Sequence, residues 1–113
     1  MEASVSTARR VPPLIRRLVT TRADGRCETC GQRERGLDLH HRMQRSVGGH
    51  DEAFNLLAVC RRCHDRIHSG PATSRTAGWL VDSWQDPLEV PVVMRDGTYL
   101  LDGMGGLARV RRE

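Results

Sequence analysis

Apolar and polar positions recur with different periods along this chain, and each period predicts a different element. Residues 11–25, VPPLIRRLVTTRADG, space their apolar side chains as a helix does, with prolines in the first turn and glycine past the end. Residues 36–41, GLDLHH, alternate as a half-buried strand does. Residues 55–59, NLLAV, fit a second short strand, and residues 61–68, RRCHDRIH, predict a helix that ends at SGP. The predicted order is helix, strand, long loop, strand, helix.

The pattern changes from Gly78 onward. Residues 90–101, VPVVMRDGTYLL, place Asp-Gly between two β-prone runs, which is a strong hairpin signal. We expect Trp79 and Trp84 to cover a small core, with base stacking as the alternative for their rings. The sequence therefore divides into a flexible N-terminus at 1–10, a central domain at 11–70 and a C-terminal tail with a β-hairpin at 71–113.

The composition predicts a bound metal or a cross-link that stabilises the fold, and a polyanionic partner. Only 4% of the 113 residues are aromatic, too few for a large core, so a metal or another staple is expected. All 18 basic residues are arginine, which reflects either genome composition or phosphate binding. Residues 1–70 hold 13 arginines against 8 acidic residues, whereas residues 71–113 hold 5 against 6. Nucleic acid is the commonest partner for such a basic region.

The start of the chain predicts a cytoplasmic protein. Residues 1–18, MEASVSTARRVPPLIRRL, lack the continuous apolar stretch of a signal peptide, and no later stretch is long enough to span a membrane. A reducing compartment favours cysteines as metal ligands over disulfides.

Four cysteines form two CxxC pairs, Cys27 with Cys30 and Cys60 with Cys63. Each spacing lets a tight turn place two thiolates on one tetrahedral zinc. The 29 residues between the pairs exceed the roughly 15–20 of a simple zinc ribbon, so a segment is inserted between the knuckles. Because four thiolates complete the shell, we expect one structural Zn²⁺. Redox-active thiols are the alternative, but they accompany a βαβ pattern that this sequence lacks.

The five histidines lie in the inserted segment and in the helix after it. His64 and His68 are four residues apart on the predicted helix, so one metal can contact both. His40 and His41 are neighbours on a predicted strand and point to opposite sides, so they cannot easily serve the same metal. One can be a ligand while the other faces a substrate as a base. A site of two or three histidines leaves coordination positions open, as a catalytic metal requires.

The segments LHH, RSVGG, NLLAVC and CHDRIH resemble the HNH endonucleases, in the subgroup with two CxxC knuckles. The resemblance covers residues 27–68, and the short C-terminal tail is similar to that of small bacteriophage HNH proteins. It implies a small α+β fold: a ββα-metal finger with a four-cysteine structural zinc, an N-terminal helix and a C-terminal β-hairpin tail. Residues 11–70 would then be the nuclease domain.

The same resemblance implies a role for each candidate residue. His41 would be the general base, and Asn55 would orient the base and its loop through hydrogen bonds. One divalent cation, Mg²⁺, Mn²⁺ or Zn²⁺, would bind His40, His64 and His68.

Three further sets of residues near the motifs are interpreted individually. Asp38 could support the metal ligands from behind, although an ordinary surface residue is the preferred interpretation. His50 matches no motif position and is interpreted as a loop residue. Five arginines flank the site and are expected to contact the DNA backbone: Arg42, Arg45, Arg61, Arg62 and Arg66.

The implied reaction is metal-dependent hydrolysis of DNA phosphodiester bonds, which leaves 5′-phosphate and 3′-hydroxyl ends. The acting species would be a monomer or weak dimer, with the phage terminase large subunit as a further expected partner. The alternative is a non-catalytic zinc module that binds nucleic acid or a protein. The combination of the motif histidines with Asn55 favours the nuclease, because a binding module has no chemical need for it.

Overall fold

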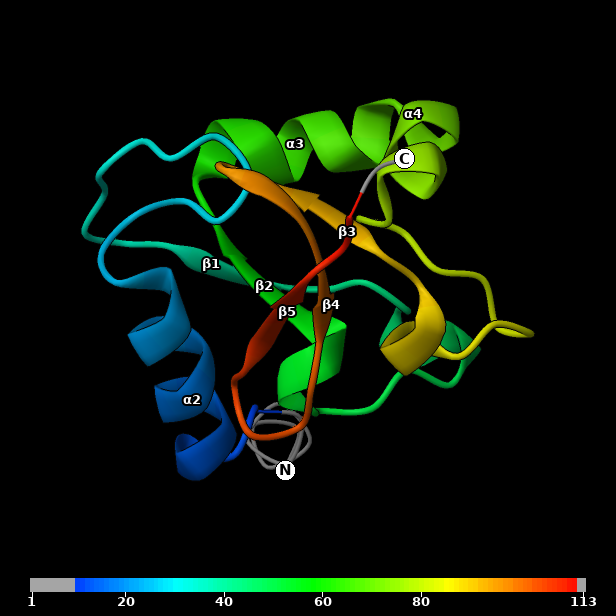
Figure 1. Cartoon of the computed structure of the whole chain (residues 1–113), viewed down its shortest axis with the longest axis horizontal. Coiled ribbons are helices and arrows are strands. Elements are labelled where there is room, and N and C mark those ends of the chain that lie inside the picture. Colours follow the sequence, from blue (N-terminus) through cyan, green and yellow to red (C-terminus); the bar gives the residue numbers. More distant parts are fainter. Residues whose placement is uncertain (1–9, 112–113) are drawn as a thin grey trace, which may run out of the picture.

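The computed structural model describes residues 10–111, so nearly all of the predicted flexible N-terminus lies outside the described residues. Two small antiparallel sheets lie between helices α3 and α4 at one end of the molecule and helix α2 at the other (Figure 1). The elements are α2 (Pro13–Ala23), β1 (Asp38–His41), η1 (Arg45–Val47), η2 (Ala53–Asn55), β2 (Leu56–Val59), α3 (Arg61–Ser69), α4 (Pro71–Ala77), η3 (Pro87–Glu89), β3 (Val92–Met94), β4 (Gly97–Leu101) and β5 (Leu107–Arg109).

Strand β2 forms the centre of the core because all four of its side chains are buried. Leu57 and Val59 face a cluster that contains the cysteines and the C-terminal strands. Leu56 and Ala58 face the opposite way, into the cluster covered by α2. Since successive side chains on a strand alternate, one short apolar run connects both halves of the molecule.

Helix α2 has the ends that its sequence predicts. Prolines occupy its first turn, where a missing N–H costs nothing, and the left-handed Asp24 ends it by donating its N–H to Thr20 at 3.0 Å. Val19 and Ala23 are fully buried against the β2 cluster. The apolar stripe therefore docks the helix on the strand that leads into the second CxxC pair.

The predicted fold class is confirmed. Strands β1 and β2 pair antiparallel and are followed by α3, which gives the expected ββα order, and β3 pairs with β4 as the predicted hairpin. Apart from the three short 3₁₀ helices, one α-helix and one strand were not predicted: α4 begins at a proline directly after α3, and β5 extends the hairpin to three strands. The C-terminal strands pack into the same core as the cysteines, because Tyr99 and Leu101 belong to that cluster.

None of the helices within residues 10–111 has the length and apolar character needed to cross a membrane.

Candidate functional site

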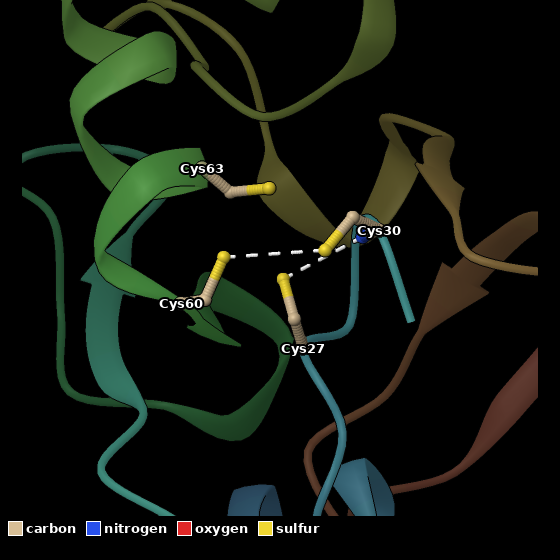
Figure 2. A group of neighbouring side chains, drawn as sticks. All are labelled: Cys27, Cys30, Cys60 and Cys63. Carbon is tan, nitrogen blue, oxygen red and sulfur yellow. Dashed lines mark hydrogen bonds between the residues drawn. The ribbon is translucent and has the colours of Figure 1, made fainter. Parts of the chain in front are cut away.

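The four cysteines converge on one point between the loop after α2 and the start of α3 (Figure 2). Cys27 and Cys30 lie on a tight turn closed by a Gly31 N–H bond to the Cys27 carbonyl at 2.8 Å. Cys60 is the N-cap of α3, and Cys63 lies in its first turn. All four sulfur atoms lie within 4.8 Å of one another.

This sulfur cluster fits a zinc ion. Zn–S bonds of about 2.3 Å in a tetrahedron place the sulfur atoms roughly 3.8 Å apart, and the Sγ atoms of Cys30 and Cys60 are 3.9 Å apart. Burial opposes ionisation of Cys27, but hydrogen bonds from Thr29 and backbone amides outweigh it and lower its pKa to about 6. Burial raises the pKa of the Cys63 thiol to about 12. A bound cation would draw both to the thiolate form.

A buried ion pair fastens the first cysteine turn to the core. The guanidinium of Arg22 donates to both carboxylate oxygens of Glu28, at 2.8 and 2.9 Å, and both side chains are about 1% exposed. Glu28 also accepts from the Ala58 N–H at 3.0 Å. Arg22 donates further to the backbone oxygens of Ala53 and Leu56. The turn therefore keeps a fixed position relative to β2, whose chain continues into the second cysteine pair.

Three histidines form a second cluster on the other side of the start of α3. Ring nitrogens of His40, His64 and His68 lie within 4.8 Å of one another, and each pair of ring centroids is 5.1–5.2 Å apart. His64 and His68 face the same way because they are one turn apart on α3. Burial lowers the pKa of His40 to about 4, so its ring is neutral at pH 7 and can serve as a ligand.

Hydrogen bonds orient two of these rings for metal binding. His40 Nε2 lies 2.7 Å from the backbone oxygen of Trp79, which can only accept, so Nε2 carries the proton and Nδ1 keeps its lone pair. The carboxylate of Asp38 accepts from Nδ1 of His64 at 3.0 Å, which leaves Nε2 of that ring free. Such outer partners fix the tautomer and the direction of a ligand. Three imidazole nitrogens suit one divalent cation and leave positions open for other ligands.

His41 lies apart from this cluster, although it is the next residue on the strand. Its Nε2 donates to Oδ1 of Asp51 at 2.7 Å, so Nδ1 is the nitrogen that carries the lone pair when the ring is neutral. Arg45 donates to the same carboxylate at 3.1–3.2 Å. Burial opposes ionisation of Asp51, but the bonds from His41 and Arg45 outweigh it and hold its pKa below the usual range. His40 and His41 thus face different partners, as their alternation on a strand requires.

Asn55 holds the loop between the two strands. Its side chain accepts from the N–H of Met43 at 2.8 Å and donates to the backbone oxygens of Met43 and His50 at 2.9 and 3.0 Å. Gly49 lies so close to the Met43 carbonyl that no Cβ fits there. These contacts fix the path of the loop that delivers Asp51 to His41. His50 contributes its backbone oxygen, in line with its interpretation as a loop residue.

The predicted contact between Arg42 and the DNA backbone is wrong. The side chain of Arg42 is 0% exposed, and it donates to four backbone oxygens at 2.7–3.1 Å. Those oxygens belong to Phe54, Gly78, Pro87 and Val90. Burial, with a smaller contribution from the Arg22 charge, lowers its pKa to about 9, so it stays charged at pH 7. Arg42 ties the C-terminal segment, including the stretch beside Trp79, to the histidine strand.

We expect Arg42→Met to lower the free energy of unfolding by about 3 kcal/mol, because it leaves buried carbonyl groups without donors. Urea denaturation measures this loss. Arg62→Met is the matched control, since Arg62 is exposed on α3. A loss no larger than that of the control would mean that Arg42 is not a structural anchor.

The other four arginines differ in solvent exposure and in the ion pairs that they already make. Arg61 is 75% exposed and lies 3.6 Å from Asp38, beside the metal ligands. Arg62 and Arg66 are also exposed on α3. Arg45 is engaged with Asp51 beside the candidate base. All four retain donors that a phosphate could reach, so their expected DNA contacts stay predictions.

Two contributors to the site were not identified from the sequence. Asp51 carried no signal, because it lies in a turn-rich loop ten residues from the histidine that it contacts. Trp79 contributes a backbone oxygen, which no side-chain pattern reveals. Asp38 contacts His64, so the structure supports its role behind the candidate ligands rather than the preferred interpretation as an ordinary surface residue.

Comparison with known proteins finds a family match over the segment that contains the cysteine and histidine clusters. Residues 27–70 match the HNH endonuclease family. The type IV methyl-directed restriction enzyme EcoKMcrA of Escherichia coli (strain K12) is 30% identical over 64 residues, which cover 50% of this chain and 23% of that enzyme. The chain thus spans less than a quarter of that relative. No solved structure matches the chain significantly.

Proposed function

We propose that this chain is a metal-dependent DNA endonuclease, whose nuclease domain includes the segment at residues 27–70 that matches the HNH endonuclease family. The substrate would be a DNA phosphodiester bond, and the products would carry 5′-phosphate and 3′-hydroxyl ends. A single observation carries the proposal. His41, with a free ring nitrogen, lines the same hollow of about 230 Å³ as His40, His64 and His68, which can hold one cation.

In the proposed reaction, His41 moves a proton, and the three other histidines of the hollow hold the cation. Nδ1 of His41 takes a proton from the water that attacks phosphorus, and neutral imidazole is suited to that task. Asp51 keeps the ring directed by accepting from Nε2. Asn55 keeps the loop in place without touching the proton that moves.

A divalent cation held by His40, His64 and His68 would stabilise the charge that develops on the phosphate and on the departing 3′ oxygen. Asp38 and the Trp79 carbonyl direct two of the three ligands. The four-cysteine zinc would take no part in the reaction, because its shell is complete. Arg45 lines the histidine hollow and Arg61 lies 3.6 Å from Asp38, so either guanidinium could meet a phosphate there.

Two biological roles are supported, each by a different resemblance. The two CxxC knuckles are similar to those of small phage HNH proteins, which supports a role beside a packaging terminase. Similarity to EcoKMcrA supports a role in restriction instead. Because one active site cuts one strand, double-strand cleavage would need a weak dimer or a partner enzyme.

The test of the proposal is cleavage of supercoiled plasmid with Mg²⁺, Mn²⁺ or Zn²⁺, followed by mapping of the cut ends. We expect open-circular DNA first, with 5′-phosphate and 3′-hydroxyl termini. A chain that binds plasmid but cuts it with none of these metals would favour the alternative, a non-catalytic zinc module.

A metal count gives an independent prediction. We expect one tightly held zinc per chain and a second, exchangeable cation, because one site has four thiolates and the other three imidazoles. His64→Ala should remove only the exchangeable cation, as measured by elemental analysis and calorimetric titration. His50→Ala is the control, since its exposed ring lies outside the cluster. Loss of the tight zinc in His64→Ala, with the exchangeable site intact, would contradict the division into two sites.

A further inference from the structure

A second hollow adjoins the histidine site, and the proposed chemistry does not use it. Its volume is about 220 Å³, and it lies between η1 and the loop at residues 80–84. Gln44 lines both this hollow and the one at the histidines, so the two are neighbours. In Figure 1 the loop after α4 extends to the same side of the molecule as the segment that follows β1.

The indole of Trp84 lines this hollow and is 79% exposed. The expectation that both tryptophans cover a core is therefore wrong for Trp84. Trp79 does pack against the main cluster, and its indole N–H donates to the Val93 oxygen at 2.8 Å. A tryptophan exposed beside a polar site can offer its large apolar face to a ligand.

The turn that carries this indole is well anchored. The N–H of Gln85 donates to the oxygen of Asp82 at 3.0 Å, and the Gln85 side chain accepts from the Asp82 N–H at 2.9 Å. Asp82 also accepts from Arg75 of α4 at 3.1 Å. The backbone N–H of Val81 bonds to the oxygen of Arg42, the residue after the candidate base. The indole is therefore presented from a fixed loop, and little ordering would remain for a ligand to impose.

We propose that Trp84 stacks on a nucleobase of the DNA strand whose phosphodiester bond lies at the histidine site. This inference rests on the proposed function. The hollow matches the chemistry of a base, which has a flat apolar face and a polar edge. Val47 and Leu80 provide apolar wall beside the indole, and the Gln44 amide can donate and accept at its rim.

The surroundings favour a base over a protein partner. Only Val47, 47% exposed, adds a large exposed apolar side chain to the indole within this hollow. A stable protein interface buries a far larger area around its anchors. A nucleobase needs only the indole and its immediate walls. Because Gln44 lines both hollows, a base in this one would lie near a phosphate bound at the histidines.

The test measures affinity for a labelled oligonucleotide by fluorescence anisotropy, in the full chain carrying His41→Ala so that the DNA stays intact. Loss of one stacked base should weaken binding about 5- to 100-fold in Trp84→Ala, and Trp84→Phe should recover much of it. Leu14→Ala is the control, because Leu14 is an exposed apolar residue, 66% exposed, on α2.

Single abasic positions scanned along the oligonucleotide identify the stacked base. We expect one position at which base removal weakens binding by the Trp84 protein but not by Trp84→Ala. The proposal would be overturned if Trp84→Ala bound the oligonucleotide as tightly as the His41→Ala chain that retains Trp84. It would also be overturned if removing each base weakened DNA binding equally in both chains, or if Trp84→Ala weakened the binding of a protein but not of DNA.

Plasmid cleavage by the chain with His41 intact separates the two proposals. If that chain cuts DNA and Trp84→Ala leaves its KM unchanged, stacking fails and the nuclease stands. If it binds DNA through Trp84 but never cuts, the nuclease fails and stacking stands.

Discussion

Replacing His41 with alanine is expected to slow plasmid cleavage by about 10²- to 10⁴-fold, the contribution typical of a general base. The substitution removes the ring that lines the hollow with the three candidate ligands, and it leaves those ligands in place. Initial rates of supercoiled plasmid conversion measure the loss. Metal content and the unfolding midpoint should not change.

His50→Ala is the matched control for this prediction. Its ring is exposed, and only its backbone oxygen bonds to Asn55. Cleavage by His41→Ala at the control's rate would show that another group, or no group, takes the proton.

The same assay tests whether Asp51 positions the base. Asp51→Asn keeps an oxygen that can accept from Nε2 of His41, whereas Asp51→Ala removes the acceptor. We expect rates to fall in the order wild type, Asp51→Asn, Asp51→Ala, His41→Ala, with kcat changing more than KM. Asp65→Asn, an exposed carboxylate on α3, is the control. Full activity of Asp51→Ala would remove Asp51 from the mechanism.

The parts of the fold that follow from local periodicity could be predicted from the sequence. The alternation in residues 36–41 places His40 and His41 on opposite sides, and their separate partners reflect it. The spacing of His64 and His68 and the two CxxC pairs likewise fix which side chains can meet. These signals work because a helix or a tight turn determines the geometry within a few residues.

Contacts that depend on tertiary packing could not be predicted. Arg42 looks like any arginine beside a motif, and only the return of the C-terminal chain buries it under four carbonyl groups. The bond between His40 and the Trp79 backbone spans 39 residues and involves no side chain of Trp79. Residues 71–113 carry no motif of their own, yet their backbone orients a candidate ligand.

Replacing Cys30 with serine is expected to release the tight zinc and unfold the domain. A structural zinc contributes on the order of 10 kcal/mol of apparent binding free energy, comparable with the whole stability of a small domain, about 5–15 kcal/mol. Cys27, Cys60 and Cys63 are themselves part of the main buried cluster, so an ion bound there would lie within the core. Far-ultraviolet circular dichroism and zinc content measure the outcome, with Gln32→Ala, an exposed residue on the same turn, as the control.

Comparing which metals are lost in Cys30→Ser and in His64→Ala should distinguish the proposed structural zinc from the proposed catalytic cation. Cys60 and Cys63 begin α3, and His64 follows directly, so release of zinc frees the turn that positions His64 and His68. Cys30→Ser should therefore lose both metals, while His64→Ala loses only the exchangeable one and keeps its fold. A Cys30→Ser protein that stays folded and still binds the exchangeable cation would show that the histidine site does not depend on the zinc. Excess EDTA should reproduce the Cys30→Ser result in the wild-type chain, and added Zn²⁺ should reverse it, because the ligands themselves are intact.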